Sequence, residues 1–133
     1  MEIRQIRSAV VTSFLLGLLL ITSSAHAEEK KSGGGYVTLE PFTSNLVETD
    51  RYLQINISLK SESPGFEDNV KIYMPKVRHV VLMTLCGKKS EELLSTKGKM
   101  QLMAELKDAI NQALDVNGDR GVSEVVFTNF VVQ

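Results

Sequence analysis

The sequence is poor in cysteine, proline and aromatic residues: its 133 residues include one cysteine, three prolines and no tryptophan. The single cysteine, Cys86, excludes a disulfide within the chain, so an apolar core must hold the fold together. Because Cys86 ends an apolar stretch and precedes Gly87, we expect a small buried thiol at the end of a helix.

Neither sign of charge predominates, since 15 Lys and Arg residues stand against 16 Asp and Glu residues, for a net charge of −1. A near-neutral balance gives no reason to expect a nucleic acid partner. Histidine is scarce as well: His26 lies near the N-terminus, and His79 follows Arg78 in a segment where we expect it to be exposed.

The residue types that catalysis needs are not arranged for it. Beyond the N-terminal segment that contains His26, one histidine and one cysteine, His79 and Cys86, cannot form a tetrahedral zinc site within one chain without carboxylate help. No serine lies in a nucleophile elbow, and no carboxylate pair is placed by its spacing to act as acid and base. The sequence therefore predicts a protein that is not an enzyme and that uses no cofactor and no metal.

Long hydrophobic runs are lacking too, because the strongest candidate, residues 9–21, is short. At about 1.5 Å per residue it spans roughly 20 Å as a helix, against roughly 30 Å of bilayer hydrocarbon. Arg4 and Arg7 precede this run, and the small residues Ala25 and Ala27 follow it. This order is typical of a secretory signal peptide.

We therefore predict a signal peptide over residues 1–27, with cleavage after Ala27 and a mature chain that starts at Glu28. The alternative is a short membrane anchor that is retained. Either way, we expect residues 28–133 to lie outside the cytoplasm. Residues 28–35 are charged and then glycine-rich, which indicates a flexible linker, and residues 36–133 form one domain.

Two segments of alternating polarity open this domain. In residues 36–42, Val37 and Leu39 share a face, and Pro41 lacks an N–H, so this strand ends there or lies at a sheet edge. Residues 52–60 alternate strictly, which predicts a strand that is packed on one side and wet on the other. A polar turn over residues 47–51 joins them, so we expect a β-hairpin.

Apolar residues at three- and four-residue spacing predict helices between Pro64 and Leu114. Pro75 lies inside the first helical segment and should kink or divide it. Gly87 is expected at its C-terminal cap, and Ser90 is expected to cap the next helix. After a break over residues 95–98, helical periodicity resumes in a stripe formed by Met103, Leu106, Ile110, Ala113 and Leu114.

The last segment, residues 122–133, is rich in β-branched and aromatic residues, and strict alternation makes both of its faces apolar. One face holds Val125, Phe127 and Val131, and the other holds Val126, Phe130 and Val132. A strand with two apolar faces is buried on both. We expect the helices to cover one face and a neighbouring subunit to cover the other, and we assign Val126, Phe130 and Val132 to this oligomer or partner interface.

The predicted order of elements is β-β-α-α-β, which is typical of an α+β domain with a small sheet and two helices on one face. One turn in this order suggests chemistry: Asp115, Asn117, Asp119 and Ser123 have the spacing of oxygen ligands in a calcium loop. However, Arg120 stands where such a loop needs glycine, and Val126 stands where it needs a closing carboxylate. A polar turn explains these residues better.

The order of several segments resembles the FliL family of flagellar basal-body-associated proteins across residues 36–133. The most specific pieces are the Tyr-Leu-Gln strand at residues 52–54 and the terminal Phe127-Thr-Asn-Phe-Val-Val-Gln133. Weaker pieces are Met74-Pro-Lys-Val-Arg78, Lys89-Ser-Glu-Glu-Leu93 and Thr96-Lys-Gly-Lys99.

The resemblance implies a stomatin/prohibitin-like periplasmic domain beside the inner membrane and the flagellar basal body. It implies a non-enzymatic accessory role in flagellar rotation, swimming or swarming, with stator proteins and further copies of the chain, arranged in a ring, as partners. Members of that family typically carry a full-length membrane helix, so the resemblance also implies membrane association, although residues 9–21 form a shorter apolar run than such a helix. The alternative function is a small periplasmic or secreted binding module with a weak calcium or ligand site at the Asp115 turn, unrelated to motility.

Overall fold

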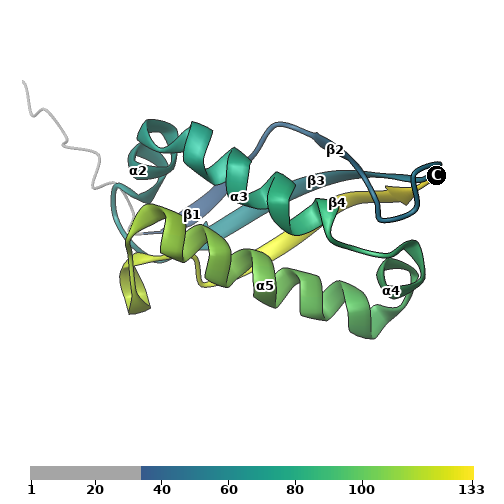
Figure 1. Cartoon of the computed structure of the whole chain (residues 1–133). Helices are drawn as coiled ribbons and strands as arrows, with labels where there is room; N and C mark the ends of the chain where they lie inside the picture. Colours follow the sequence, from purple (N-terminus) through teal and green to yellow (C-terminus); the bar gives the residue numbers. More distant parts are fainter. Residues whose placement is uncertain (1–33) are drawn as a thin grey trace, which may run out of the picture. The chain divides into compact units, whose positions relative to one another are not determined.

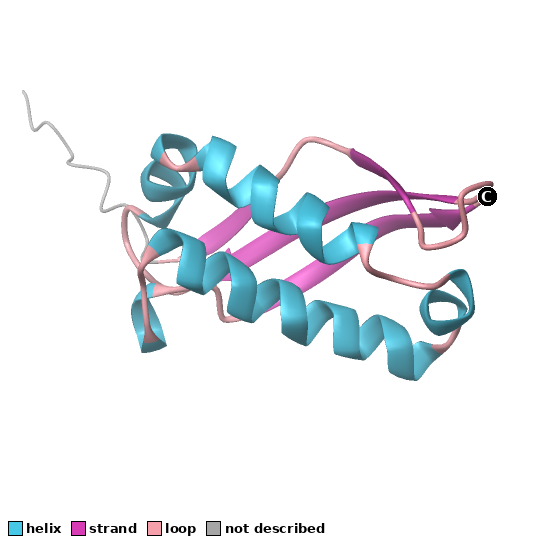
Figure 2. Cartoon of the chain, viewed as in Figure 1, coloured by secondary structure: helices cyan, strands magenta, loops and turns pink. Residues whose placement is uncertain are grey.

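The computed structural model describes residues 34–133. Four strands form one antiparallel sheet, and the described helices all lie in the connection between the third and the fourth strand (Figures 1 and 2). The strands are β1 (Gly35–Thr38), β2 (Phe42–Asn45), β3 (Tyr52–Ser61) and β4 (Glu124–Val132). The helices are α2 (Phe66–Ile72), α3 (Met74–Cys86), α4 (Ser90–Leu94), α5 (Thr96–Leu114) and the short 3-10 helix η1 (Gly118–Arg120).

Strand β3 is the centre of the sheet, because β4 pairs along one of its edges while β1 and β2 pair along the other. Leu59, for example, has Val37 of β1 and Val125 of β4 as its two neighbours. The predicted alternation of β3 is confirmed. Its inward-facing side chains are completely buried: Leu53, Ile55, Ile57 and Leu59.

The edge formed by β1 and β2 is interrupted at residues 39–41. β1 pairs with the C-terminal part of β3, and β2 pairs with its N-terminal part. Between them the N–H of Leu39 still donates to the carbonyl of Ile57 at 2.9 Å. Pro41 has no N–H to donate, and the prediction that this strand ends there or lies at a sheet edge is confirmed on both counts, since β1 ends at Thr38 and, among the described strands, pairs only with β3. The second piece, β2, was not predicted, and it is β2 that forms the tight hairpin with β3 through the turn.

Strand β4 contains a β-bulge at Thr128. Asn129 pairs with Asn56, but the next residue of β3, Ile57, pairs with Phe127, so Thr128 has no partner of its own. A bulge inserts one extra residue and thereby changes which side chains share a face. Strict alternation along the last strand was therefore a wrong prediction.

The first helical segment is divided as predicted. Tyr73 lies between α2 and α3, and Pro75 occupies the first turn of α3. The first N–H groups of a helix have no partner within it, so proline is tolerated there. Helix α3 ends at Cys86, and Gly87 takes the C-cap position, as predicted.

The next helix starts one residue earlier than predicted. Lys89 is the N-cap of α4, and Ser90 is its first residue, so Ser90 does not cap the helix. The break before α5 is a single residue, Ser95, whose hydroxyl oxygen accepts a hydrogen bond from the N–H of Gly98 at 2.9 Å. At Gly98 a Cβ would lie 1.8 Å from the carbonyl oxygen of Glu92, so only glycine fits this turn.

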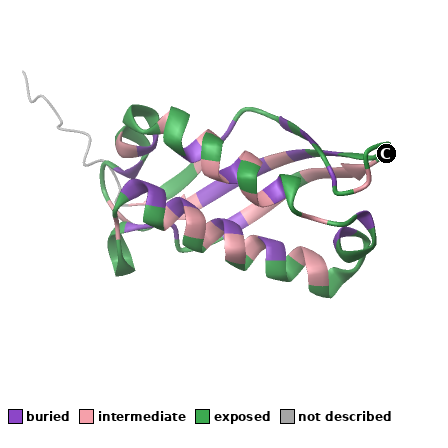
Figure 3. Cartoon of the chain, in the orientation of Figure 1, coloured by how far each residue is buried: buried purple, intermediate pink, exposed green. Residues whose placement is uncertain are grey.

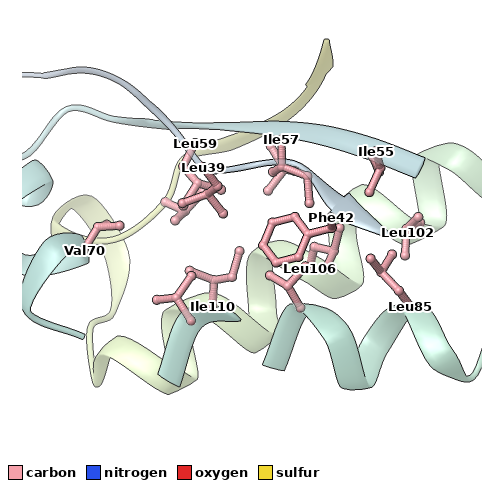
Figure 4. Packing of buried hydrophobic residues seen from close by; sticks show 14 of the residues in the cluster. Leu39, Phe42, Ile55, Ile57, Leu59, Val70, Leu85, Leu102, Leu106 and Ile110 are labelled. Atoms are coloured by element: carbon pink, nitrogen blue, oxygen red, sulfur yellow. The ribbon is translucent and has the colours of Figure 1, made fainter. Parts of the chain in front are cut away.

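Helices α3 and α5 both cover one face of the sheet, and the core fills the space between these two layers (Figure 4). Figure 4 shows Phe42 and Ile57 from the sheet layer facing Leu106 of α5, and Ile55 facing Leu102 of the same helix. Figure 3 shows the buried positions recurring along both helices. The predicted α+β class, with helices on one face of a small sheet, is confirmed. Among residues 34–133, no helix combines the length and apolar composition needed to cross a bilayer.

The two ends of this unit are distinct (Figure 1). At one end, Gly34 lines a hollow together with residues 63–68, which lead into α2. At the other end, Tyr52 and Gln133 exchange two hydrogen bonds of 2.9 Å, and α4 lies nearby. The point where the chain enters the unit is therefore one strand length, roughly 30 Å for a ten-residue strand, from the end that carries α4.

Candidate functional site

The single-residue candidates for chemistry lie apart from one another. His79 is exposed on α3, as predicted. Cys86 lies at the end of α3, as predicted, but it is exposed, so the expected burial was wrong. Val77, Val81 and Leu85 form the buried stripe of α3. Cys86 follows Leu85 and is rotated by about 100° away from that stripe, where its thiol lies 3.2 Å from the hydroxyl of Ser44.

The Asp115 turn has a structural part in the fold. Asp115 ends α5 in the left-handed conformation, at φ 53°, and its N–H donates to the carbonyls of Asn111 and Gln112. Its side chain, and those of Asn117 and Asp119, are exposed. Within residues 34–133, no group of three or more His, Cys, Asp or Glu side chains is placed to hold a metal ion.

The same turn is attached to the sheet through Asn111. The side-chain oxygen of Asn111 accepts from the N–H of Val122 at 2.7 Å, and its amide donates to the carbonyl of Val122 at 3.2 Å. The side chain thus pairs with the main chain as a neighbouring strand would. It satisfies both polar groups of Val122, which is itself buried.

Two interactions join the α4 end of the unit, and neither has a sequence pattern that predicts it. The carboxylate of Glu48, in the β2–β3 turn, accepts from the N–H and the hydroxyl of Ser90. Lys88 forms an ion pair with Glu105 of α5, and its side chain is only 18% exposed. The pKa of Glu105 lies below its usual value, chiefly because Lys88 donates a hydrogen bond to this carboxylate.

The sheet face opposite the helices is not covered by any element of residues 34–133 (Figures 1 and 2). The register places mainly polar residues of β3 on it: Gln54, Asn56, Ser58 and Lys60. Val126 and Val131 of β4 are the apolar neighbours of Ser58 and Gln54. This face is therefore a mixed surface with two valines at one edge, and the expectation that β4 is apolar on both faces was too broad.

The predicted interface residues do not share one face. Val126 lies on the uncovered face, opposite Ser58. Phe130 and Val132 lie opposite Ile55 and Leu53, on the face that packs against the helices. The bulge at Thr128 is the reason, since it moves every later side chain of β4 to the other face. Their grouping on a single face was wrong, and a role of each in assembly stays a prediction.

What these three residues do share is the outer edge of the sheet. Along residues 124–132, β4 pairs with β3 on one side, and no strand within residues 34–133 pairs with its other side. Its residues from Val126 to Val132 are partly exposed, except Thr128, which is exposed. An uncovered strand of this length is a template for pairing with another chain. We take this edge as the candidate functional site.

The alternation of hydrogen bonds shows which main-chain groups of β4 point outward. Tyr52 and Gln133 exchange both of their hydrogen bonds, so the main chain of Gln133 faces β3. Alternate residues of an antiparallel pair face alternate sides. Consequently the N–H and C=O groups that face the open edge belong to Val125, Phe127, Phe130 and Val132.

The predicted signal-peptide cleavage residues, Ala25, Ala27 and Glu28, lie outside the described residues, as do the linker residues 28–33. Cleavage therefore stays a prediction.

Comparison with known proteins gives a consistent result over the folded part. The sequence model of the family described as "Flagellar basal body-associated protein FliL" matches residues 36–133. "Flagellar protein FliL" of Escherichia coli (strain K12) is 28% identical over 99 residues, which cover 74% of this chain and 64% of that protein. "Flagellar protein FliL" of Aquifex aeolicus (strain VF5) is 30% identical over 95 residues, which cover 70% of this chain and 57% of that protein. The matched regions thus span less than two thirds of the length of these relatives.

Proposed function

The chain belongs to the FliL family of flagellar basal body-associated proteins, and we propose that it is a non-enzymatic accessory protein of the flagellar motor. The observation that carries this proposal is the extent of the family match. Residues 36–133 contain β2, β3, β4 and every described helix, and they include the core between sheet and helices. The part shared with the family is therefore the folded unit itself.

We place this unit in the periplasm, beside the inner membrane, with stator proteins of the motor as its partners and further copies of the chain as neighbours in a ring. The signal or anchor pattern of residues 1–27 supports export. The similarity of the domain to the stomatin/prohibitin fold belongs to the same proposal, and the α+β architecture is compatible with it.

The folded unit has two different ends, which lie at opposite ends of its strands. The preceding chain enters at Gly34, beside α2 (Figure 1). The opposite end, with α4 and the β2–β3 turn, lies one strand length away. We propose that this opposite end, roughly 30 Å from Gly34 for a ten-residue strand, is available to the periplasmic parts of the motor.

Deletion of the gene in its own bacterium tests the proposed function. We expect reduced swimming in soft agar and in viscous medium, with filaments still present by electron microscopy. Plasmid expression of the chain should restore swimming, and so should expression of Met100→Ala, a change at an exposed position. Normal swimming of the deletion strain in both media would contradict the proposal.

N-terminal sequencing of the chain isolated from cells tests its attachment separately. A chain that starts at Glu28 has lost its signal peptide and must reach the motor through protein contacts. A chain that starts at Met1 keeps residues 9–21 as an anchor. The first result is the one we expect, and the second would overturn the predicted cleavage.

A further inference from the structure

The open edge strand has a sequence that reads almost the same in both directions. Residues 125–132 are Val-Val-Phe-Thr-Asn-Phe-Val-Val. Only the central pair, Thr128 and Asn129, breaks the symmetry, and these two are similar in size and polarity. When two copies of such a strand lie antiparallel about a two-fold axis, valine meets valine and phenylalanine meets phenylalanine.

In a regular strand this arrangement would fail. Val125 and Val132 are an odd number of residues apart, so strict alternation would place them on opposite faces of the sheet. The bulge at Thr128 removes this conflict. Val125 and Val132 both lie on the core face, opposite Leu59 and Leu53, and Val126 and Val131 both lie on the uncovered face.

The aromatic residues follow the same rule. Phe127 and Phe130 both lie on the core face, opposite Ile57 and Ile55, and their ring centroids are 5.4 Å apart. Two-fold pairing places Phe127 of one copy opposite Phe130 of the other. The two phenylalanine pairs then lie together at the axis, in an arrangement that aromatic rings favour.

The main-chain N–H and C=O groups of β4 also point in the directions that this pairing needs. The N–H and C=O groups that face the open edge belong to Val125, Phe127, Phe130 and Val132. In the two-fold register, Val125 pairs with Val132 of the other copy, and Phe127 pairs with Phe130. Each residue with outward-facing groups therefore meets another such residue, as a hydrogen-bonded antiparallel pair requires.

We propose that β4 pairs antiparallel with β4 of a second copy of this chain, about a two-fold axis between Thr128 and Asn129, so that two sheets become one. Residues 125–132 carry no charged side chain of their own, and the ammonium group of Lys99 from α5 lies over the Phe130 ring, 5.0 Å from its centroid. The inference deepens the proposed self-association by naming its surface. It also adds a restriction: a two-fold pair is closed, so a ring of these pairs needs a second, different contact.

Register-specific disulfides test the pairing in the full chain. In a Cys86→Ser background, Val126→Cys and Val131→Cys are co-expressed with different tags and then oxidised. In the proposed register, residue 126 of one copy and residue 131 of the other form a non-hydrogen-bonded antiparallel pair. The Cα atoms of such a pair lie about 4.5 Å apart, which is within the range of a disulfide. We expect a disulfide-linked pair that carries both tags, and none above background when either variant is expressed alone.

The matched control replaces Val131→Cys with Asn129→Cys, which lies on the same face but is displaced by two residues from the register. This combination should give no cross-link above background. Equal cross-linking in the control, or none with Val126→Cys and Val131→Cys, would overturn the proposed pairing.

A charge at the axis gives an independent measurement. Thr128→Lys places two like charges across the axis, and light scattering should then show loss of the pair, whereas Thr43→Lys on β2 should leave the wild-type mass. Thermal unfolding of both variants reports whether each still folds. A wild-type mass for folded Thr128→Lys would contradict the pairing. Reduced swimming of the deletion strain, together with failed cross-linking, would overturn this contact while leaving the proposed function intact.

Discussion

The carboxylate of Glu48 accepts hydrogen bonds from both the main-chain N–H and the hydroxyl of Ser90, each at 3.1 Å. The adjacent Val47 donates its N–H to the carbonyl of Lys88 at 3.0 Å. The turn between β2 and β3 is thereby attached to the start of α4, although 42 residues separate Glu48 from Ser90. This carboxylate is thus one of the links that hold together the end of the unit farthest from Gly34.

This attachment should weaken in acid. The pKa of Glu48 lies below its usual value, because its carboxylate accepts from its own N–H and from that of Ser90, with further contributions from the Ser90 hydroxyl and from Arg51. A carboxyl group with a lowered pKa stabilises the fold at neutral pH and loses this effect as the pH falls through the folded-state value. Glu48→Gln should therefore flatten the acid limb of a plot of unfolding free energy against pH.

The matched control for this change is Glu91→Gln, an exposed carboxylate in the first turn of α4. Its acid limb should stay close to that of the wild type. Identical acid limbs for Glu48→Gln and the wild type, measured by urea unfolding between pH 3 and pH 7, would be inconsistent with a stabilising Glu48–Ser90 contact.

Truncation of the core should be far more costly than truncation of the surface. Leu106 is completely buried between α5 and the sheet (Figure 4). Leu106→Ala removes apolar contacts and leaves a cavity, and we expect a loss of about 2–5 kcal/mol in the free energy of unfolding. Met100→Ala, at a side chain that is 63% exposed, should change it by about 0.5 kcal/mol or less. Chemical denaturation measures both, and similar losses would refute the assigned core.

The close approach of α4 to α5 depends on Gly98. Gly98→Ala would place a methyl group 1.8 Å from the carbonyl oxygen of Glu92. The main chain must then move, and we expect a loss of about 1–3 kcal/mol, typical of overpacking. Gly87→Ala is the control, since no atom lies within 4 Å of its Cβ position. A loss no larger for Gly98→Ala than for Gly87→Ala would show that this turn adapts freely.

The side chain of Asn111 should contribute strongly to stability. Asn111→Ala leaves the N–H and C=O of buried Val122 without their partners, and each buried unsatisfied group costs about 1–3 kcal/mol. Gln112→Ala, at the exposed neighbouring position, should cost much less. Hydrogen exchange provides a local readout: the N–H of Val122 should lose protection in Asn111→Ala. Retained protection would mean that another group replaces the side chain.

The local sequence pattern was sufficient to predict those strands and helix boundaries that depend on their own residues alone. Strict alternation in β3 reports a strand with one buried face, and Pro41 and Pro75 remove hydrogen-bond donors wherever they occur. The family resemblance, carried by the Tyr-Leu-Gln strand and the terminal segment, was likewise readable from the chain and is shown by the comparison.

Features that depend on a partner strand or a distant segment were not predictable in this way. The bulge at Thr128 exists because β4 must match the register of β3, and nothing in Thr-Asn alone marks it. Its omission put Phe130 and Val132 on the wrong face. Ser90 has the residue type of a helix cap, but its hydroxyl donates instead to the carboxylate of Glu48, which comes from another part of the chain. Cys86 follows an apolar stretch, and only the rotation of α3 decides that it is exposed.

The interruption at residues 39–41 has a consequence for growth of the sheet. Strands that pair through both edges can add subunits without limit and produce fibres. In this chain one edge of the sheet consists of two short strands, β1 and β2, separated by a segment that contains Pro41. This edge therefore offers no continuous row of hydrogen-bonding groups to a strand of another chain. In the proposed β4–β4 pair, sheet growth therefore stops after a single step, because the outer edges of the joined sheet carry the break at Pro41.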